Sequence, residues 1–105
     1  MFDFKQLQKL QEEVQNKLKK AEEQLAEKTV EASSGGGMVT VVANGQQDIL
    51  SIKINPDAVD PDDIEMLEDL VIAAVNSALE QSKELKQRVM GGVTGGFGLP
   101  GGFPF

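Results

Sequence analysis

The stretch that decides the fold reads GGGMVTV at residues 35–41, NG at 44–45 and LEDL at 67–70. Three successive glycines favour a permissive turn. The β-branched run after them, with Val39, Val41 and Ala43 on one face, predicts a strand over 38–43. Asn44-Gly45 predicts a hairpin, because both residues tolerate positive φ. LEDL lies inside a long helical pattern, so strands and a hairpin come just ahead of a helix.

Two further segments complete a small sheet. Residues 29–33 alternate around Val30 and Ala32, which predicts a short strand. Residues 49–54 alternate Leu50, Ile52 and Ile54 with the residues between them. With the strand at 38–43 and the Asn44-Gly45 turn, these segments predict a three-stranded antiparallel meander.

A long helix is expected ahead of the sheet, over residues 4–28. Asp3 suits the N-cap, and Gln6 stands where a capping box wants Glu or Gln. An apolar stripe follows the helical period. Its members are Leu7, Leu10, Val14, Leu18, Ala21 and Leu25.

A second helix is expected from Pro61 to about Val89, with Asp60 as its N-cap. It is apolar nearly all round over residues 70–75. Residues 91–105 are rich in Gly, Pro and Phe and should form a mobile tail without a packed core. The chain therefore reads as one α+β domain over residues 1–90, followed by a tail over 91–105.

The lengths of these elements predict an intertwined homodimer. The helices would measure roughly 37 and 43 Å, whereas strands of about six residues reach roughly 20 Å. The helices should overhang the sheet and leave apolar surface that a two-fold partner would cover. The alternative is antiparallel packing of both helices within one chain. The expected interface residues are Leu70, Val71, Ile72, Val75 and Leu79.

Composition argues against an enzyme. The 105 residues include no His, Cys, Trp or Tyr, which removes thiol and imidazole chemistry and the usual zinc or haem ligands. No catalytic residue, metal site, cofactor or small-molecule substrate is expected. No apolar run approaches the roughly 20 residues of a membrane span, and no signal peptide is visible. The expected location is the cytoplasm.

Net charge argues against a polyanion partner, because 10 Lys and Arg stand against 17 Asp and Glu, a formal charge of −7. Two sets of basic residues are nevertheless candidates for phosphate contact. Both have a simpler interpretation, as a solvated helix face or as cations that complement a helix C-terminus. The first-helix set is Lys5, Lys9, Lys17, Lys19, Lys20 and Lys28, and the second-helix set is Lys83, Lys86 and Arg88.

Three other features could form a metal or acid/base site, a phosphate-binding loop or a docking segment. Glu68 and Asp69 point about 100° apart on a helix, so they are poorly placed to share a proton or a metal ion. Residues 35–37 precede a strand, whereas a phosphate-binding loop precedes a helix. The aromatic residues of the tail would dock on a partner or on the dimer; the alternative is that they are only tethered to a disordered end. They are Phe97, Phe103 and Phe105.

The order helix, three strands, helix and Gly-rich tail resembles the YbaB/EbfC family of nucleoid-associated proteins over nearly the whole chain. The resemblance rests on the order and spacing of several elements together. They are Gly37, Val39 and Val41; Asn44-Gly45; Ile54 and Pro56; Asp63, residues 66–70 (MLEDL), Ala74, Asn76 and Ala78; and the ending LPGGFPF at 99–105.

The resemblance implies a bacterial homodimer whose helices project like tweezers and bind double-stranded DNA in the nucleoid, with a role in nucleoid organisation or gene regulation. The mechanism would be electrostatic, with Lys and Arg beside phosphates. The alternative is an acidic adaptor that grips other proteins without touching DNA.

Overall fold

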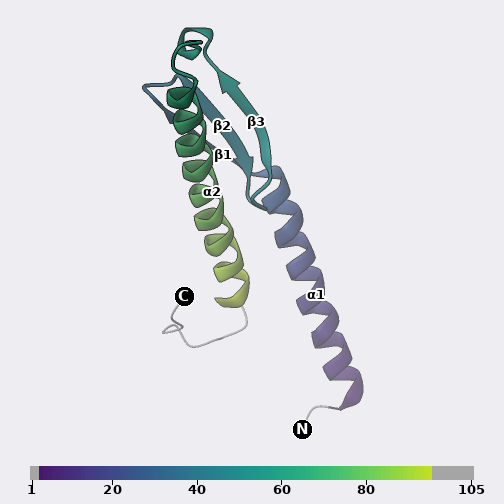
Figure 1. Ribbon diagram of the computed structural model, residues 1–105. Helices are drawn as coiled ribbons and strands as arrows, with labels where there is room; N and C mark the ends of the chain where they lie inside the picture. Colours follow the sequence, from purple (N-terminus) through teal and green to yellow (C-terminus); the bar gives the residue numbers. More distant parts are fainter. Residues whose placement is uncertain (1–2, 96–105) are drawn as a thin grey trace.

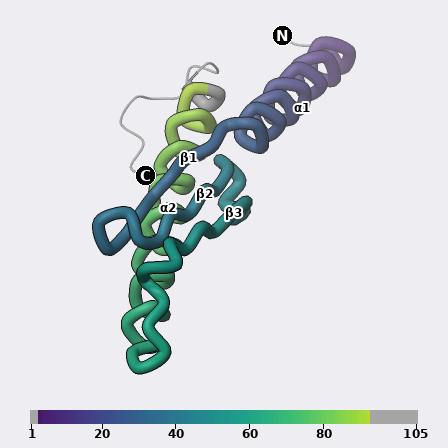
Figure 2. Tube along the Cα trace, turned by 90° about the horizontal axis from the view of Figure 1, so that it is seen from above, coloured from purple at the N-terminus to yellow at the C-terminus, as the bar shows by residue number. Residues whose placement is uncertain are grey.

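The computed structural model describes residues 3–95 and contains two helices and one antiparallel sheet of order β1-β2-β3. Helix α2 lies along the sheet, whereas α1 leads away from it, and a second view shows the same divergence (Figures 1 and 2). The elements are α1 (Phe4–Glu27), β1 (Thr29–Ser34), β2 (Val39–Asn44), β3 (Ile49–Ile54), the 3-10 turn η1 (Pro56–Ala58) and α2 (Ile64–Gly95). The predicted α+β order is therefore confirmed.

The core lies between α2 and the first two strands. Val39, Val41 and Ala43 are fully buried, as their predicted common face requires, and they meet Ala74 and Ala78 of α2. Small residues on the helix let its backbone come close to the valine-rich face of β2. Val30, Leu67, Leu70, Val71 and Val75 pack around this centre.

The glycine run between β1 and β2 is a turn, as predicted. All three glycines have positive φ (61, 67 and 94°), a conformation that costs glycine little and other residues more. The turn is tied to the second helix, because Ser34 Oγ donates a 2.6 Å hydrogen bond to the Leu70 carbonyl.

Strand β3 extends the same sheet beyond the cover of α2. Ile52 and Ile54 pair with Val41 and Val39, and directly paired residues share a face of the sheet. Yet Ile52 and Ile54 are 45% and 41% exposed, whereas their partners are fully buried. A single chain thus leaves the outer third of its apolar sheet face open.

Helix α1 begins with the predicted capping box: Asp3 Oδ1 accepts from Gln6 N at 2.8 Å, and Gln6 Oε1 accepts from Asp3 N at 3.3 Å. Only its C-terminal part is packed. Ala21 and Leu25 are buried, but Leu7 and Leu10 are each 47% exposed. The overhang expected from the sequence is therefore present in α1, and the chain measures 72 Å along its longest axis.

The predicted bounds of the second helix were wrong at both ends. Asp60 does not cap it; the backbone instead makes a separate turn, in which Asp60 O accepts from Asp63 N at 2.9 Å. The cap comes from Asp63, whose Oδ1 accepts from Met66 N at 3.2 Å. At the other end the helix continues through Gly91 to Gly95, so the first part of the predicted tail is helical. Residues 96–105, with Phe97, Phe103 and Phe105, lie outside the described residues.

The hairpin after β2 forms, but not by the predicted mechanism. The residue with positive φ is Gln47 (67°) rather than Asn44 or Gly45. Gly45 is required for a different reason: a Cβ there would lie 2.6 Å from Leu25 Cδ2 and 2.8 Å from the Leu25 carbonyl oxygen. Its N–H donates to the carbonyls of Leu25 (2.8 Å) and Lys28 (3.0 Å), which satisfies backbone acceptors at the end of α1.

Asn44 organises the same corner from inside the protein. Its side-chain oxygen accepts from the backbone N–H groups of Gln46 (2.9 Å) and Asp48 (3.0 Å). The fully buried Ser82 of α2 donates from Oγ to the Asn44 carbonyl at 2.6 Å. This corner therefore ties α1, the hairpin and α2 together.

We predict that Gly45→Ala lowers the free energy of unfolding by about 2–3 kcal/mol, because the new methyl group would overlap the Leu25 backbone. Urea denaturation followed by circular dichroism measures the change. The control is Gly91→Ala, where a Cβ meets nothing within 4 Å and alanine should be neutral or stabilise the helix by up to about 1 kcal/mol. Equal stabilities for the two variants would contradict this role of Gly45.

We also predict that Ser82→Ala costs about 1–2 kcal/mol of unfolding free energy, since it removes a buried hydrogen bond to Asn44. The matched control is Ser77→Ala on the exposed face of the same helix, which should change stability by less than about 0.5 kcal/mol. Thermal or urea unfolding of both variants makes the comparison. A Ser82→Ala variant as stable as the control would show that this bond contributes little.

Candidate nucleic-acid interface

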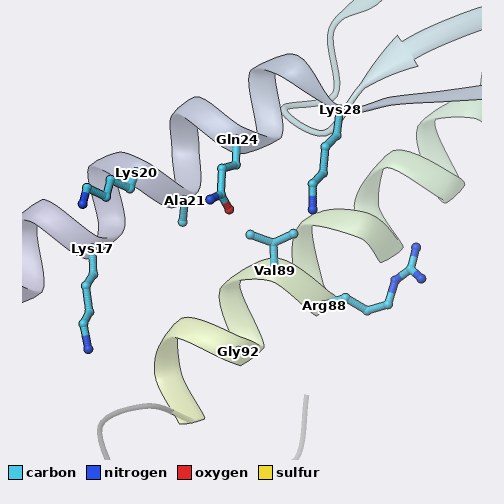
Figure 3. A pocket seen from close by; sticks show the side chains of 8 residues that line it. All are labelled: Lys17, Lys20, Ala21, Gln24, Lys28, Arg88, Val89 and Gly92. Carbon is cyan, nitrogen blue, oxygen red and sulfur yellow. The ribbon is translucent and has the colours of Figure 1, made fainter.

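A cleft of about 500 Å³ lies where α1 and α2 diverge. Figure 3 shows Lys28, the residue after α1, pointing toward α2, and Val89 pointing back from α2 toward α1. Four of its lining residues are cationic: Lys17 and Lys20 from α1, Lys28 directly after α1, and Arg88 from α2. The other four are Ala21, Gln24, Val89 and Gly92.

The cleft exists because the two helices touch over a short length only. Ala21 of α1 is buried and Val89 of α2 is half-buried, so these two small side chains form the floor. On either side of them the long basic side chains are exposed to solvent. Cations with apolar stems commonly cover such a floor while their charged ends stay in water.

The sequence spacing explains why α1 contributes two lysines. Residues 17, 20, 21 and 24 recur at helical spacing and occupy one face next to the apolar stripe, and Lys28 follows at the C-cap of the helix. Along the helix axis, Lys17 and Lys28 are about 16 Å apart. The cleft therefore presents a row of cations rather than a single point charge.

The charge of the cleft is opposite to that of the chain. It holds four of the 10 basic residues, and no Asp or Glu within residues 3–95 is among those that line it. The chain has 17 acidic residues and a net charge of −7. A polyanion can therefore approach here without meeting an acid on the cleft wall.

The structure divides the basic residues that the sequence singled out. Of the first-helix set, Lys17, Lys20 and Lys28 line the cleft, whereas Lys5, Lys9 and Lys19 do not. Of the second-helix set, only Arg88 lines it. Arg88 and Lys86 point about 160° apart around α2, so the three cations of that set do not form one patch.

Acidic residues gather at the opposite end of α2. Those between residues 57 and 69 are all exposed, and they surround the exposed apolar residues Val59, Ile64 and Met66. This acidic end is made of Asp57, Asp60, Asp62, Asp63, Glu65, Glu68 and Asp69. Acids are thus concentrated at one end of α2, whereas its other half carries Glu80 and Glu84 together with Lys83, Lys86 and Arg88.

The predicted interface residues occupy two environments. Leu70, Val71 and Val75 pack against the core of their own chain, which explains much of the apolar run over 70–75 without a partner. Leu79 is half-buried, and Ile72 is 56% exposed. Sequence analysis did not single out the uncovered β3 face, although the alternation of Leu50, Ile52 and Ile54 was visible.

Other kinds of site find little support in the described part of the chain. Within residues 3–95, no cluster of three or more His, Cys, Asp or Glu side chains is placed to hold a metal ion. Glu68 and Asp69 are both exposed. No helix over these residues combines the length and apolar character needed to cross a membrane.

The fold is similar to that of a protein whose structure has been solved. The crystal structure of an uncharacterized protein from Helicobacter pylori superposes with a TM-score of 0.79. It covers 90% of this chain and 99% of that one, at 23% sequence identity. The two proteins therefore share this arrangement of helices and strands.

Sequence comparison is more specific. A nucleoid-associated protein of Thermoanaerobacter pseudethanolicus is 54% identical over 100 residues, which are 95% of this chain and 86% of that protein. One of Bacillus cereus is 58% identical over 83 residues, 79% of this chain and 76% of that protein. A model of the YbaB/EbfC DNA-binding family matches residues 1–97. The chain therefore belongs to the YbaB/EbfC DNA-binding family.

Proposed function

We propose that this protein binds duplex DNA as a homodimer, mainly through phosphate contacts from its diverging helices, and acts in nucleoid organisation or gene regulation. The place of action is the cytoplasmic nucleoid. The observation that carries the proposal is the cleft, which brings Lys17, Lys20, Lys28 and Arg88 together from two separate parts of the chain. Family membership and the names of the relatives support the choice of DNA.

A net charge of −7 argues against DNA binding, but the charged residues that line the cleft within residues 3–95 are all basic. Phosphate contacts release counterions, so affinity depends on the cations at the contact more than on the net charge. Seven exposed acids gather at the far end of α2, and the glutamates nearer the cleft, such as Glu27 and Glu84, are not among the residues that line it. Lys5, Lys9, Lys19, Lys83 and Lys86 lie outside the cleft, and we assign them a weaker, longer-range contribution to the potential.

The dimer is supported by the apolar surface that one chain leaves open. Ile52, Ile54 and Ile72 are each more than 40% exposed, although Ile52 and Ile54 continue the buried face of β2. Exposed apolar surface of this kind marks interaction sites. We therefore extend the expected interface from Ile72, Val75 and Leu79 of α2 onto β3. Two-fold pairing would place one cleft on each protomer.

A second candidate function rests on the acidic end. Exposed Val59, Ile64 and Met66 among carboxylates would suit a basic, partly apolar protein segment. In that case the protein is an adaptor, and DNA contact is indirect. Direct DNA binding and the adaptor role predict opposite results in a titration with purified duplex.

We predict that a labelled duplex binds the purified protein and that affinity falls steeply with salt, by a slope of about 0.9 in log K against log salt for each phosphate contact. Fluorescence anisotropy across a salt series measures the slope. The double variant Lys20→Gln, Arg88→Gln should bind more weakly, and its slope should be shallower.

The control is Lys83→Gln, Lys86→Gln, which removes the same charge outside the cleft and should leave the slope close to that of the wild type. Equal losses in both variants would show that net charge decides binding, not the cleft. An absence of any binding at low salt would instead favour the adaptor.

We also predict that sedimentation velocity finds the mass of two chains and that Ile52→Asn raises the dimer dissociation constant by at least about tenfold, since a buried isoleucine contributes about 1.5–3 kcal/mol. The control is Lys53→Gln, the next residue of the same strand, on the opposite face. Circular dichroism checks that both variants remain folded. A wild type that sediments as a single chain would overturn the dimer.

A further inference from the structure

We infer that the α1–α2 cleft is also a binding site for a free linear oligophosphate, which competes there with the DNA backbone. The competition rests on the proposed DNA binding, whereas the oligophosphate site rests on the cleft itself. The inference follows from what the cleft contains, what it lacks and how large it is.

The size of the cleft excludes an enclosed duplex. A volume of about 500 Å³ is typical of pockets for small ligands, which run from about 300 to 1,000 Å³. The major groove of DNA alone is about 12 Å wide, so the cleft can take only one edge of a duplex, namely the phosphates of one strand. A flexible chain of phosphates fits the same space entirely.

The lining offers hydrogen-bond donors suited to phosphate oxygens. Lysine and arginine form charge-assisted hydrogen bonds with phosphate oxygens, and Gln24 adds an amide donor. Proteins that grip single-stranded nucleic acid add aromatic side chains on which bases stack. No Phe is among the residues that line the cleft within residues 3–95, and the chain has no Trp or Tyr. The bases of a nucleic acid would therefore gain little here.

The arrangement of charge suits a linear ligand. Lys17 and Lys20 stand at one end of the Ala21–Val89 floor, and Lys28 with Arg88 at the other (Figure 3). An oligophosphate carries its charges along a line and can contact both ends at once. A compact dianion such as sulfate can contact one end only, so it should bind far more weakly.

The test uses sodium tripolyphosphate as the probe, titrated into the full-length protein in an isothermal calorimeter at constant ionic strength. We expect saturable binding with one site per chain, and no comparable binding of sodium sulfate. The variant Lys20→Gln, Lys28→Gln, Arg88→Gln should lose at least about tenfold in affinity, since three phosphate contacts are removed.

The matched control is Lys5→Gln, Lys9→Gln, Lys19→Gln, which removes the same charge from the same part of the molecule but outside the cleft. Its tripolyphosphate affinity should stay within about twofold of the wild type, because these three side chains do not line the cleft and exposed charges without direct contact are weakened by water and salt. The absence of saturable binding, or an equal loss in both triple variants, would overturn the site.

A competition experiment separates this inference from the proposed function. Tripolyphosphate should displace a labelled duplex from the wild type at concentrations where sulfate of equal ionic strength does not. If the duplex binds but tripolyphosphate neither binds nor displaces it, the inference is wrong and DNA binding stands. If tripolyphosphate binds in the cleft but no duplex binds at low salt, the competition and the proposed function fail together, while the oligophosphate site remains.

Discussion

The close approach of Gly45 to the end of α1 is the constraint on which the rest of the structure depends. Its N–H satisfies the carbonyls of Leu25 and Lys28, and no side chain stands between the two backbones. This joint sets the direction in which α1 leaves the sheet. That direction brings Ala21 against Val89 and opens the cleft beyond them, so the hydrogen-bonded corner at Gly45 determines where the cations meet.

The sequence pattern predicts the helices and strands correctly, but it does not predict the start of α2 or the conformation of the turn after β2. The period of 3.6 in α1 and the alternation in β2 arise because one face of each element is buried. Leu25, Val39 and Val41 belong to these predicted faces and are buried in the structure. The start of α2 was misjudged because Asp60 and Asp63 can both accept a backbone N–H. Only the backbone path decides between them. The backbone path also decides which residue of the loop between Asn44 and Ile49 has positive φ. That residue is Gln47, the third of the four loop residues.

The sequence identifies the individual cations of the candidate site, but it does not predict that they line one cleft. Each cation is plain in the sequence, and each helix shows which residues share a face. Arg88 joins Lys28 only because of the angle at which α1 and α2 diverge, and that angle comes from tertiary packing around Gly45. Ala21 and Val89 read as ordinary members of apolar stripes, so their role as a shared floor had no signal in the sequence.

The concentration of acids at one end of α2 gives the molecule an electric polarity from end to end. Asp63 and Arg88 are about 37 Å apart along the helix, a distance much longer than the range of screened interactions in the cell. A polyanion close to the protein therefore feels attraction at one end and repulsion at the other, and the resulting torque turns the molecule before contact. The protein should therefore approach a polyanion already oriented, with its acidic end turned away and its cleft turned toward the charge.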